Sequence, residues 1–263
     1  MLRAWMALAA VAFCGAASGQ APSYSTAQIV NASDYSPGPF APNSMLTIFG
    51  SNLANFPPNQ GVGLPDVGIA SVPIVLGGVS VYIDNSPVPL LYVSASQINL
   101  LIPPNEIAGD VPVQVDRQGT RGPITTITLV NAAPALFLSS PDYALALDYN
   151  ANSSTVTSSA PAQPGDLIIL YAAGLGSTSP NPVTGEIPGF QALISAFSSF
   201  RVLLNGKALD PTTVPYAGQA PGFPGVYQVN FYLPGPGNFT PNPQIQLAIG
   251  SQVSAPGIIL AAQ

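Results

Sequence analysis

The residues able to perform acid–base or nucleophilic chemistry are few in this 263-residue sequence. It contains no histidine, and its one lysine is Lys207, directly after an Asn205-Gly206 pair. Without histidine the chain lacks the usual general base, most zinc and copper ligand sets, and the Ser-His-Asp triad. A serine nucleophile would depend on Lys207, which we expect to be exposed and protonated. The sequence therefore excludes most hydrolytic and metal-dependent mechanisms.

Carboxylates are the remaining candidates for catalysis, because glycoside hydrolysis needs two acids about 5–10 Å apart. Most of them stand beside Gly, Pro or Asn, where an Asp side chain caps a turn. A carboxylate-dependent polysaccharide hydrolase is therefore an alternative hypothesis, and its test is whether two acids share a groove. The acids are Asp34, Asp66, Asp84, Glu106, Asp110, Asp116, Asp142, Asp148, Asp166, Glu186 and Asp210.

Asp148, Asn150 and Asn152 have the spacing of oxygen ligands at positions 1, 3 and 5 of a calcium loop. Ser153 then stands where such a loop has glycine, and Ser159 where it has a bidentate glutamate. An Asx turn in a linker is the simpler interpretation. We therefore predict no cofactor, with calcium at these three residues as the alternative.

Four aromatic residues are candidates for ligand contact because they lie in or beside long loops. Such side chains can stack on sugars or anchor a protein partner. Loop aromatics also close the open end of a β-sandwich, so a core position is the simpler interpretation. Tryptophan occurs once, in the first residues, which disfavours a carbohydrate ligand. The four candidates are Phe190, Phe197, Phe223 and Tyr216.

A Gln-x-Asn pattern followed by three apolar residues and proline occurs twice, at 97–103 and 228–234. Gln and Asn spaced by two share one face of a strand. They could form a polar contact row, or they could be buried amides that satisfy the backbone of an adjacent loop, which we favour. PNSMLTIFGSNL (42–53) and PGDLIILYAAGL (164–175) form a second repeated pair. These two sequence repeats indicate a duplicated domain.

The elements that hold these residues are predicted to be β-strands. Short β-branched runs alternate with turns rich in Pro and Gly, and long helical periodicity is missing. Hairpins are expected around Asp84-Asn85-Ser86 and Asn205-Gly206. We predict an all-β chain with two tandem immunoglobulin-like β-sandwich domains, and a single barrel is the alternative. The expected segments are a signal peptide (1–19), a leader (20–28), sandwich 1 (29–138), a linker (139–160) and sandwich 2 (161–263).

LTIFGSNLA (46–54), VSVYIDNSPVPLLYVSASQINLLIP (79–103) and GDVPVQVDRQG (109–119) resemble the IPT/TIG immunoglobulin-like family. IVNASDYSPGPFAPNS (29–44), PAQPGDLIILYAAGLG (161–176) and APGFPGVYQVNFYLP (220–234) are similar to an uncharacterised C-terminal module of exported acidobacterial proteins. The resemblance implies a tandem IPT/TIG-like fold on an exported protein. It supplies no catalytic residues.

Residues 1–19 have the pattern of an export signal, with Arg3, a short apolar run, and small residues before a cut after Gly19. A retained membrane anchor and a lipid anchor at Cys14 are the alternatives. Charged residues make up 6% of the chain, against about 25% in ordinary soluble proteins. Scarce positive charge argues against a nucleic-acid partner. The low pI of about 4.1 also argues against docking on an anionic lipid surface.

These observations predict a secreted or cell-surface protein without membrane insertion after signal cleavage. We expect a non-enzymatic module for adhesion, matrix or partner binding. Its partner would be an extracellular protein or polysaccharide. A third hypothesis is a structural subunit that assembles through exposed strand edges.

Overall fold

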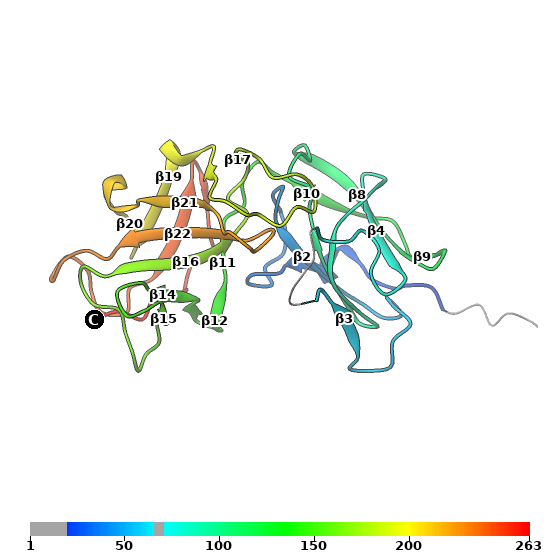
Figure 1. Cartoon of the computed structure of the whole chain (residues 1–263), viewed down its shortest axis with the longest axis horizontal. Coiled ribbons are helices and arrows are strands. Elements are labelled where there is room, and N and C mark those ends of the chain that lie inside the picture. Colours follow the sequence, from blue (N-terminus) through cyan, green and yellow to red (C-terminus); the bar gives the residue numbers. More distant parts are fainter. Residues whose placement is uncertain (1–19, 66–70) are drawn as a thin grey trace, which may run out of the picture.

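A computed structural model describes residues 20–65 and 71–263. The chain forms two β-sandwiches, which lie side by side in Figure 1. The all-β prediction is therefore confirmed. The signal peptide expected over 1–19 lies outside the described residues.

The first sandwich is built from two sheets that enclose one hydrophobic cluster. One sheet has the order β1 (Ile29–Asn31), β2 (Met45–Phe49), β7 (Gln97–Leu101), β6 (Leu90–Ser94) and β3 (Gly61–Gly63). The other has the order β10 (Thr125–Leu129), β8 (Gly109–Arg117), β4 (Val79–Ile83) and β5 (Ser86–Pro87), with β9 (Thr120–Arg121) on β8.

The second sandwich repeats this plan with longer connections. Its larger sheet runs β15 (Ser154–Thr155), β14 (Ala146–Asp148), β16 (Leu167–Ala173), β22 (Tyr227–Tyr232), β21 (Tyr216–Gln219), β18 (Leu193–Ile194) and β17 (Thr178–Ser179), and β11 (Ala135–Leu136) also pairs with β16. Its smaller sheet runs β20 (Lys207–Ala208), β19 (Phe200–Leu204), β23 (Ile245–Ile249) and β24 (Gln252–Val253). β12 (Leu138–Ser140) pairs with β13 (Tyr143–Ala144). Short 3₁₀ turns are η1 (Thr26–Gln28), η2 (Phe197–Ser199) and η3 (Pro211–Thr213).

The internal repeat corresponds to equivalent strands. The order β1-β2-β7-β6-β3 of the first sandwich matches β14-β16-β22-β21-β18 of the second. Both predicted hairpin turns are present, because Asp84-Asn85 and Asn205-Gly206 have positive φ at both positions. That backbone twist suits two antiparallel strands joined by a two-residue loop. The prediction of two tandem immunoglobulin-like sandwiches is confirmed.

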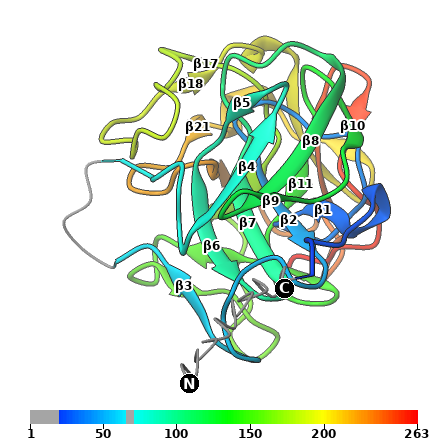
Figure 2. The same ribbon diagram turned by 90° about the vertical axis from the view of Figure 1, so that its right-hand side faces the viewer.

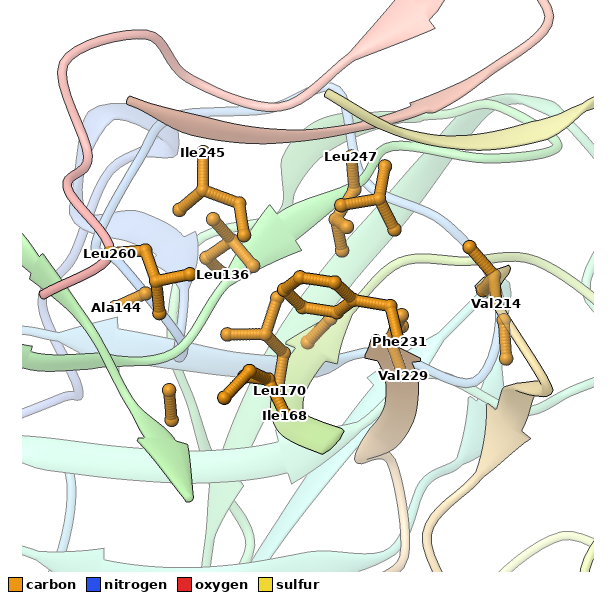
Figure 3. Packing of buried hydrophobic residues seen from close by; sticks show 14 of the residues in the cluster. Leu136, Ala144, Ile168, Leu170, Val214, Val229, Phe231, Ile245, Leu247 and Leu260 are labelled. Carbon is orange, nitrogen blue, oxygen red and sulfur yellow. The ribbon is translucent and has the colours of Figure 1, made fainter. Parts of the chain in front are cut away.

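Alternating apolar residues explain how each sandwich closes. In Figure 3, Ile168, Leu170, Val229 and Phe231 of the larger sheet face Ile245 and Leu247 of the smaller one. The fully buried Phe231 lies in the centre of this cluster. Because successive strand residues point to opposite faces, the residues between them are left on the outer face of the sheet. The candidate site lies on this outer face.

Residues 20–28 and 139–160, expected as a leader and a linker, are both folded onto the sandwiches. Tyr24 is buried in the first core, and Arg117 Nη2 donates to the Gln20 carbonyl oxygen at 2.7 Å. Segment 139–160 contains β14, which is hydrogen-bonded to β16 of the second sandwich. Its Ser/Thr/Asn run forms the tight turn of the β14–β15 hairpin, so polar composition did not signify a free linker. The exact domain boundaries stay a prediction.

The two sandwiches are joined by side-chain and backbone contacts as well as by the chain. Tyr227 donates its hydroxyl proton to the Gly176 carbonyl oxygen and accepts from Asn43 Nδ2 at 3.2 Å. Val72 N donates to the Gly185 carbonyl oxygen at 2.8 Å. Gly185 belongs to the long connection beyond β17, which extends toward the first sandwich in Figure 1 and lies beside it in Figure 2.

Candidate functional site

The repeated amides lie on the outer faces of the two equivalent sheets. Gln97 Nε2 donates to Asn99 Oδ1 at 2.9 Å, and Gln228 Nε2 donates to Asn230 Oδ1 at 2.8 Å. All four side chains are half-buried. Among the described residues, no hydrogen bond joins these amide groups to a loop backbone, and the interpretation that they hold a loop stays a prediction. Each pair instead bonds internally and faces outward.

An apolar pocket of ≈ 270 Å³ lies beside the second amide pair. The rings of Tyr171 and Phe223 meet edge to face in this pocket, with centroids 6.5 Å apart and an interplanar angle of 61°. Tyr171 is the strand partner of Gln228, so aromatic and amide side chains share one outer face. The lining residues are Phe137, Leu145, Tyr171, Phe223 and Val226.

The β21–β22 loop (220–226) holds Phe223 in an exposed position. Within it, Ala220 N donates to the Val226 carbonyl oxygen at 3.0 Å, and Phe223 N donates to the Ala220 carbonyl oxygen at 3.2 Å. Gly225 has a φ of 77° and packs so closely against Leu101 that a side chain there would clash with it. The loop is therefore tied down at its base and against the first sandwich. Phe223 remains 58% exposed.

The other predicted contact residues lie in different environments. Phe190 is 49% exposed in the segment between β17 and β18. Phe197 starts η2 and packs against the second core, as the simpler interpretation expects. Tyr216 is 7% exposed, and its hydroxyl donates to the Gln219 carbonyl oxygen at 2.6 Å. Of the four candidates, only Phe223 is among the lining residues of the pocket.

Sequence reasoning missed Phe137 and Tyr171. Tyr171 could have been found, because it occupies an outward position of the repeated strand, in register with Gln228. Phe137 carried no such signal. It follows β11, and its approach to Tyr171 depends on the backbone bond from Phe137 N to the Tyr171 carbonyl oxygen at 3.0 Å.

The candidate calcium residues form a turn. Asp148 Oδ1 accepts from Asn150 N at 2.9 Å and from Ala151 N at 3.3 Å, which is the Asx turn of the simpler interpretation. Asn150 Oδ1 accepts from Leu167 N at 2.8 Å. Among the described residues, no group of three or more His, Cys, Asp or Glu is placed to hold a metal. Calcium at Asp148, Asn150 and Asn152 stays a prediction.

Several carboxylates of the described residues accept hydrogen bonds within local turns, as Asp148, Asp166 and Asp210 do. Burial raises the pKa of Asp166, and the negative charge of Asp148 adds to that rise. Hydrogen bonds from Thr212 lower the pKa of Asp210, which caps η3. The aromatic pocket has no acid among its lining residues. The five lining residues therefore offer a mainly apolar contact surface.

Residues 31–129 match the IPT/TIG domain. The first sandwich therefore contains an IPT/TIG domain, and the match does not extend to the second. Comparison with curated proteins gives no match.

Three solved structures share a distant likeness with the chain. The glucan-utilisation protein SGBP-B of Bacteroides ovatus, in complex with a mixed-linkage heptasaccharide, has 10% identity over 91% of this chain and 41% of its own, with a TM-score of 0.34. The Plexin A4 extracellular region has 12% identity over 86% and 17%, with a TM-score of 0.25. Domains 5–6 of the S-layer protein SbsC have 9% identity over 92% and 99%, with a TM-score of 0.26.

This chain thus spans less than half of the first two structures. Because all three TM-scores are low, the ligand has to be inferred from the chemistry of the site itself.

Proposed function

We propose that this protein is a non-enzymatic module of the cell exterior that binds a neutral polysaccharide through the pocket around Tyr171 and Phe223. The observation that carries this proposal is an exposed aromatic pair beside an outward-facing pair of amides. Sugar rings present apolar C–H faces edged by hydroxyl groups. Aromatic rings can cover the C–H faces. Amide groups can both donate to hydroxyls and accept from them.

The form of the pocket supports this ligand class. Small-molecule sites are concave and mostly apolar, with a few polar groups that fix orientation. Here the five lining residues supply the apolar surface, and Gln228 and Asn230 lie in the neighbouring strand. Tyr171 is half-buried and Phe223 is exposed, and because their rings meet edge to face, a sugar that stacks on one ring also lies next to the other.

The neutrality of the pocket lining selects among polysaccharides. None of its five residues carries a charge, and the whole chain has a formal net charge of −6. An anionic polymer would approach a surface of the same sign without a cationic partner in the pocket. A neutral polymer meets no such repulsion.

Extracellular location belongs to the same proposal. It is supported by the signal pattern of residues 1–19. Among the described helices, none is long and apolar enough to cross a membrane.

Affinity electrophoresis of the purified protein tests the proposal. β-Glucan, galactomannan and arabinoxylan would serve as neutral polymers, and polygalacturonate and alginate as anionic ones. We expect at least one neutral polymer, and neither anionic polymer, to retard the protein. Phe223→Ala should lower the affinity about tenfold, which corresponds to about 1.4 kcal/mol.

Tyr149→Ala is the matched control, because Tyr149 is 60% exposed in the same sandwich but outside the pocket. It should bind like the wild type. The proposal fails if no neutral polymer retards the wild type, or if both variants lose affinity equally.

A further inference from the structure

The aromatic and amide groups of the second sandwich have counterparts at equivalent positions of the first. Phe49 pairs with Gln97 across β2 and β7, as Tyr171 pairs with Gln228 across β16 and β22. Asn99 lies two residues beyond Gln97 and bonds to it, which repeats the Gln228–Asn230 pair. Strand pairing alone does not require an aromatic residue opposite an outward-facing glutamine.

An exposed aromatic ring also reaches the strand aromatic in both sandwiches. Tyr35 is 60% exposed, and its ring centroid lies 5.9 Å from that of Phe49, at an interplanar angle of 46°. Phe223 is 58% exposed and makes the corresponding contact with Tyr171. The two exposed rings come from unrelated loops, one after β1 and the other between β21 and β22. The same pair of rings is therefore assembled in two ways.

The backbone around Tyr35 is fixed in the arrangement that presents the ring. Tyr35 N donates to the Asn31 carbonyl oxygen at 2.9 Å, and Asn31 N donates to the Ser36 carbonyl oxygen at 2.9 Å. Asp34 Oδ1 accepts from both the backbone N–H and the hydroxyl of Ser36. Tyr35 has a φ of 58°, which a tyrosine rarely adopts. The turn thus fixes the backbone from which the Tyr35 ring projects.

The polar groups of the first sandwich are oriented for an outside partner. Asn99 Oδ1 accepts from Gln97 Nε2 at 2.9 Å and from Thr47 Oγ1 at 3.1 Å. In the described part of the chain, neither Asn99 Nδ2 nor Gln97 Oε1 takes part in a hydrogen bond. The two contacts to Asn99 Oδ1 therefore leave a donor and an acceptor for the hydroxyl groups of a ligand.

We infer that the first sandwich carries a second neutral-carbohydrate site, formed by Tyr35, Phe49, Gln97 and Asn99, with the buried Thr47 holding the Asn99 amide in place. This inference rests on the proposed function of the second sandwich and extends it to a bivalent module. The β21–β22 loop (220–226) links the two sites, because Phe223 packs on Tyr171 while Gly225 packs on Leu101 and Met45. From Met45, the strand leads to Phe49 over about 13 Å.

Two sites on one body change how the protein binds a polymer. Once one site is engaged, the second binds at the high local concentration set by its short distance from the first. Loss of either site should then reduce affinity for a long polymer much more than affinity for a short oligosaccharide.

Titration calorimetry separates the two sites. The probe is a tetrasaccharide prepared from the neutral polymer that retards the wild type. We expect two tetrasaccharides per wild-type protein, one for Tyr35→Ala, one for Phe223→Ala, and no binding for the double variant. Tyr35→Phe keeps the ring and should keep two. On the intact polymer, each alanine variant should bind at least tenfold less tightly than the wild type.

The outcomes distinguish failure of the second site from failure of the proposed function. One tetrasaccharide per wild-type protein, with Tyr35→Ala indistinguishable from it, would overturn the site of the first sandwich. It would leave the proposed site of the second sandwich intact. Absence of any neutral-polymer binding by the wild type would overturn the proposed function itself. Circular dichroism of the Tyr35→Ala protein controls for folding, and the exposure of that ring predicts an unchanged spectrum.

Discussion

The two sandwiches share a frame of strands but differ in what covers it. In the first, Thr47 lies opposite Asn99 and bonds to its amide oxygen. In the second, Ile169 takes the equivalent position opposite Asn230 and has no polar group to offer. The outer sheet of the first sandwich is therefore more polar at this strand position, whereas the pocket of the second sandwich includes the apolar side chains of Phe137, Leu145 and Val226. The two sheets thus have equivalent backbones but different outer surfaces. The difference comes from the outward-facing side chains at equivalent strand positions and from the loops that lie over them.

The cores of the two sandwiches also have different side chains at equivalent positions. Leu100 and Phe231 occupy equivalent positions, three residues after Gln97 and Gln228, and both are fully buried. The second core thus holds a phenyl ring where the first holds an isobutyl group. The two hydrophobic clusters consist of different residues, so each sandwich encloses its own core.

Truncation of these core residues should give the largest effect on stability. We expect Phe231→Ala to lower the free energy of unfolding by about 3–5 kcal/mol and Leu100→Ala by about 2–5 kcal/mol, because each leaves a cavity. Hydrogen exchange followed by mass spectrometry would locate the damage. Phe231→Ala should reduce protection in β19 and β23, and Leu100→Ala in β4 and β8.

Equal loss of protection in all four strands for either variant would contradict separate cores. It would show instead that the two sandwiches unfold as one cooperative unit.

The contacts between the sandwiches allow a second, smaller test. Tyr227→Phe removes the hydroxyl that binds the Gly176 carbonyl and Asn43 Nδ2, which are left without that partner. We expect a loss of about 1–3 kcal/mol. We also expect looser contact between the sandwiches, measured as a larger radius of gyration in small-angle scattering.

Tyr24→Phe is the control within one sandwich. The Tyr24 hydroxyl donates to the Pro123 carbonyl oxygen at 2.6 Å and accepts from Val115 N at 2.8 Å. Its loss should cost a similar free energy and leave the radius of gyration unchanged. If both variants expand the protein equally, Tyr227 does not join the sandwiches.

The features of the fold that could be predicted from the sequence are those that depend on neighbouring residues in the chain. The hairpin turns at 84–85 and 205–206 follow from residues that tolerate positive φ. The duplication followed from strings long enough to align, and alternation placed Gln97 and Asn99 on one face. The two rings that complete the sites did not follow, because Tyr35 and Phe137 reach their partners through turns whose position depends on packing elsewhere. A run such as 150–159 gave no sign that it forms a hairpin instead of a linker.

Asp148→Asn should have the smallest effect, and it tests the acidic pair of the second sandwich. Burial, followed by the charge of Asp148, raises the pKa of Asp166 above its usual 3.8. The folded chain therefore holds the Asp166 proton more tightly than the unfolded chain, so stability falls as pH rises through and above this value. The asparagine of this variant would keep an acceptor for the backbone N–H groups of Asn150 and Ala151 while removing the repulsion.

Urea denaturation at two pH values would measure this effect. Because both carboxylates are partly solvent-exposed, we expect Asp148→Asn to gain a few tenths of a kcal/mol at about pH 7 and nothing at about pH 3. A gain of equal size at both pH values would place its origin in the turn and not in the charge. Added calcium provides the matched readout for the predicted cation site. If Asp148, Asn150 and Asn152 bind calcium, the ion should raise the melting temperature of the wild type more than that of the variant.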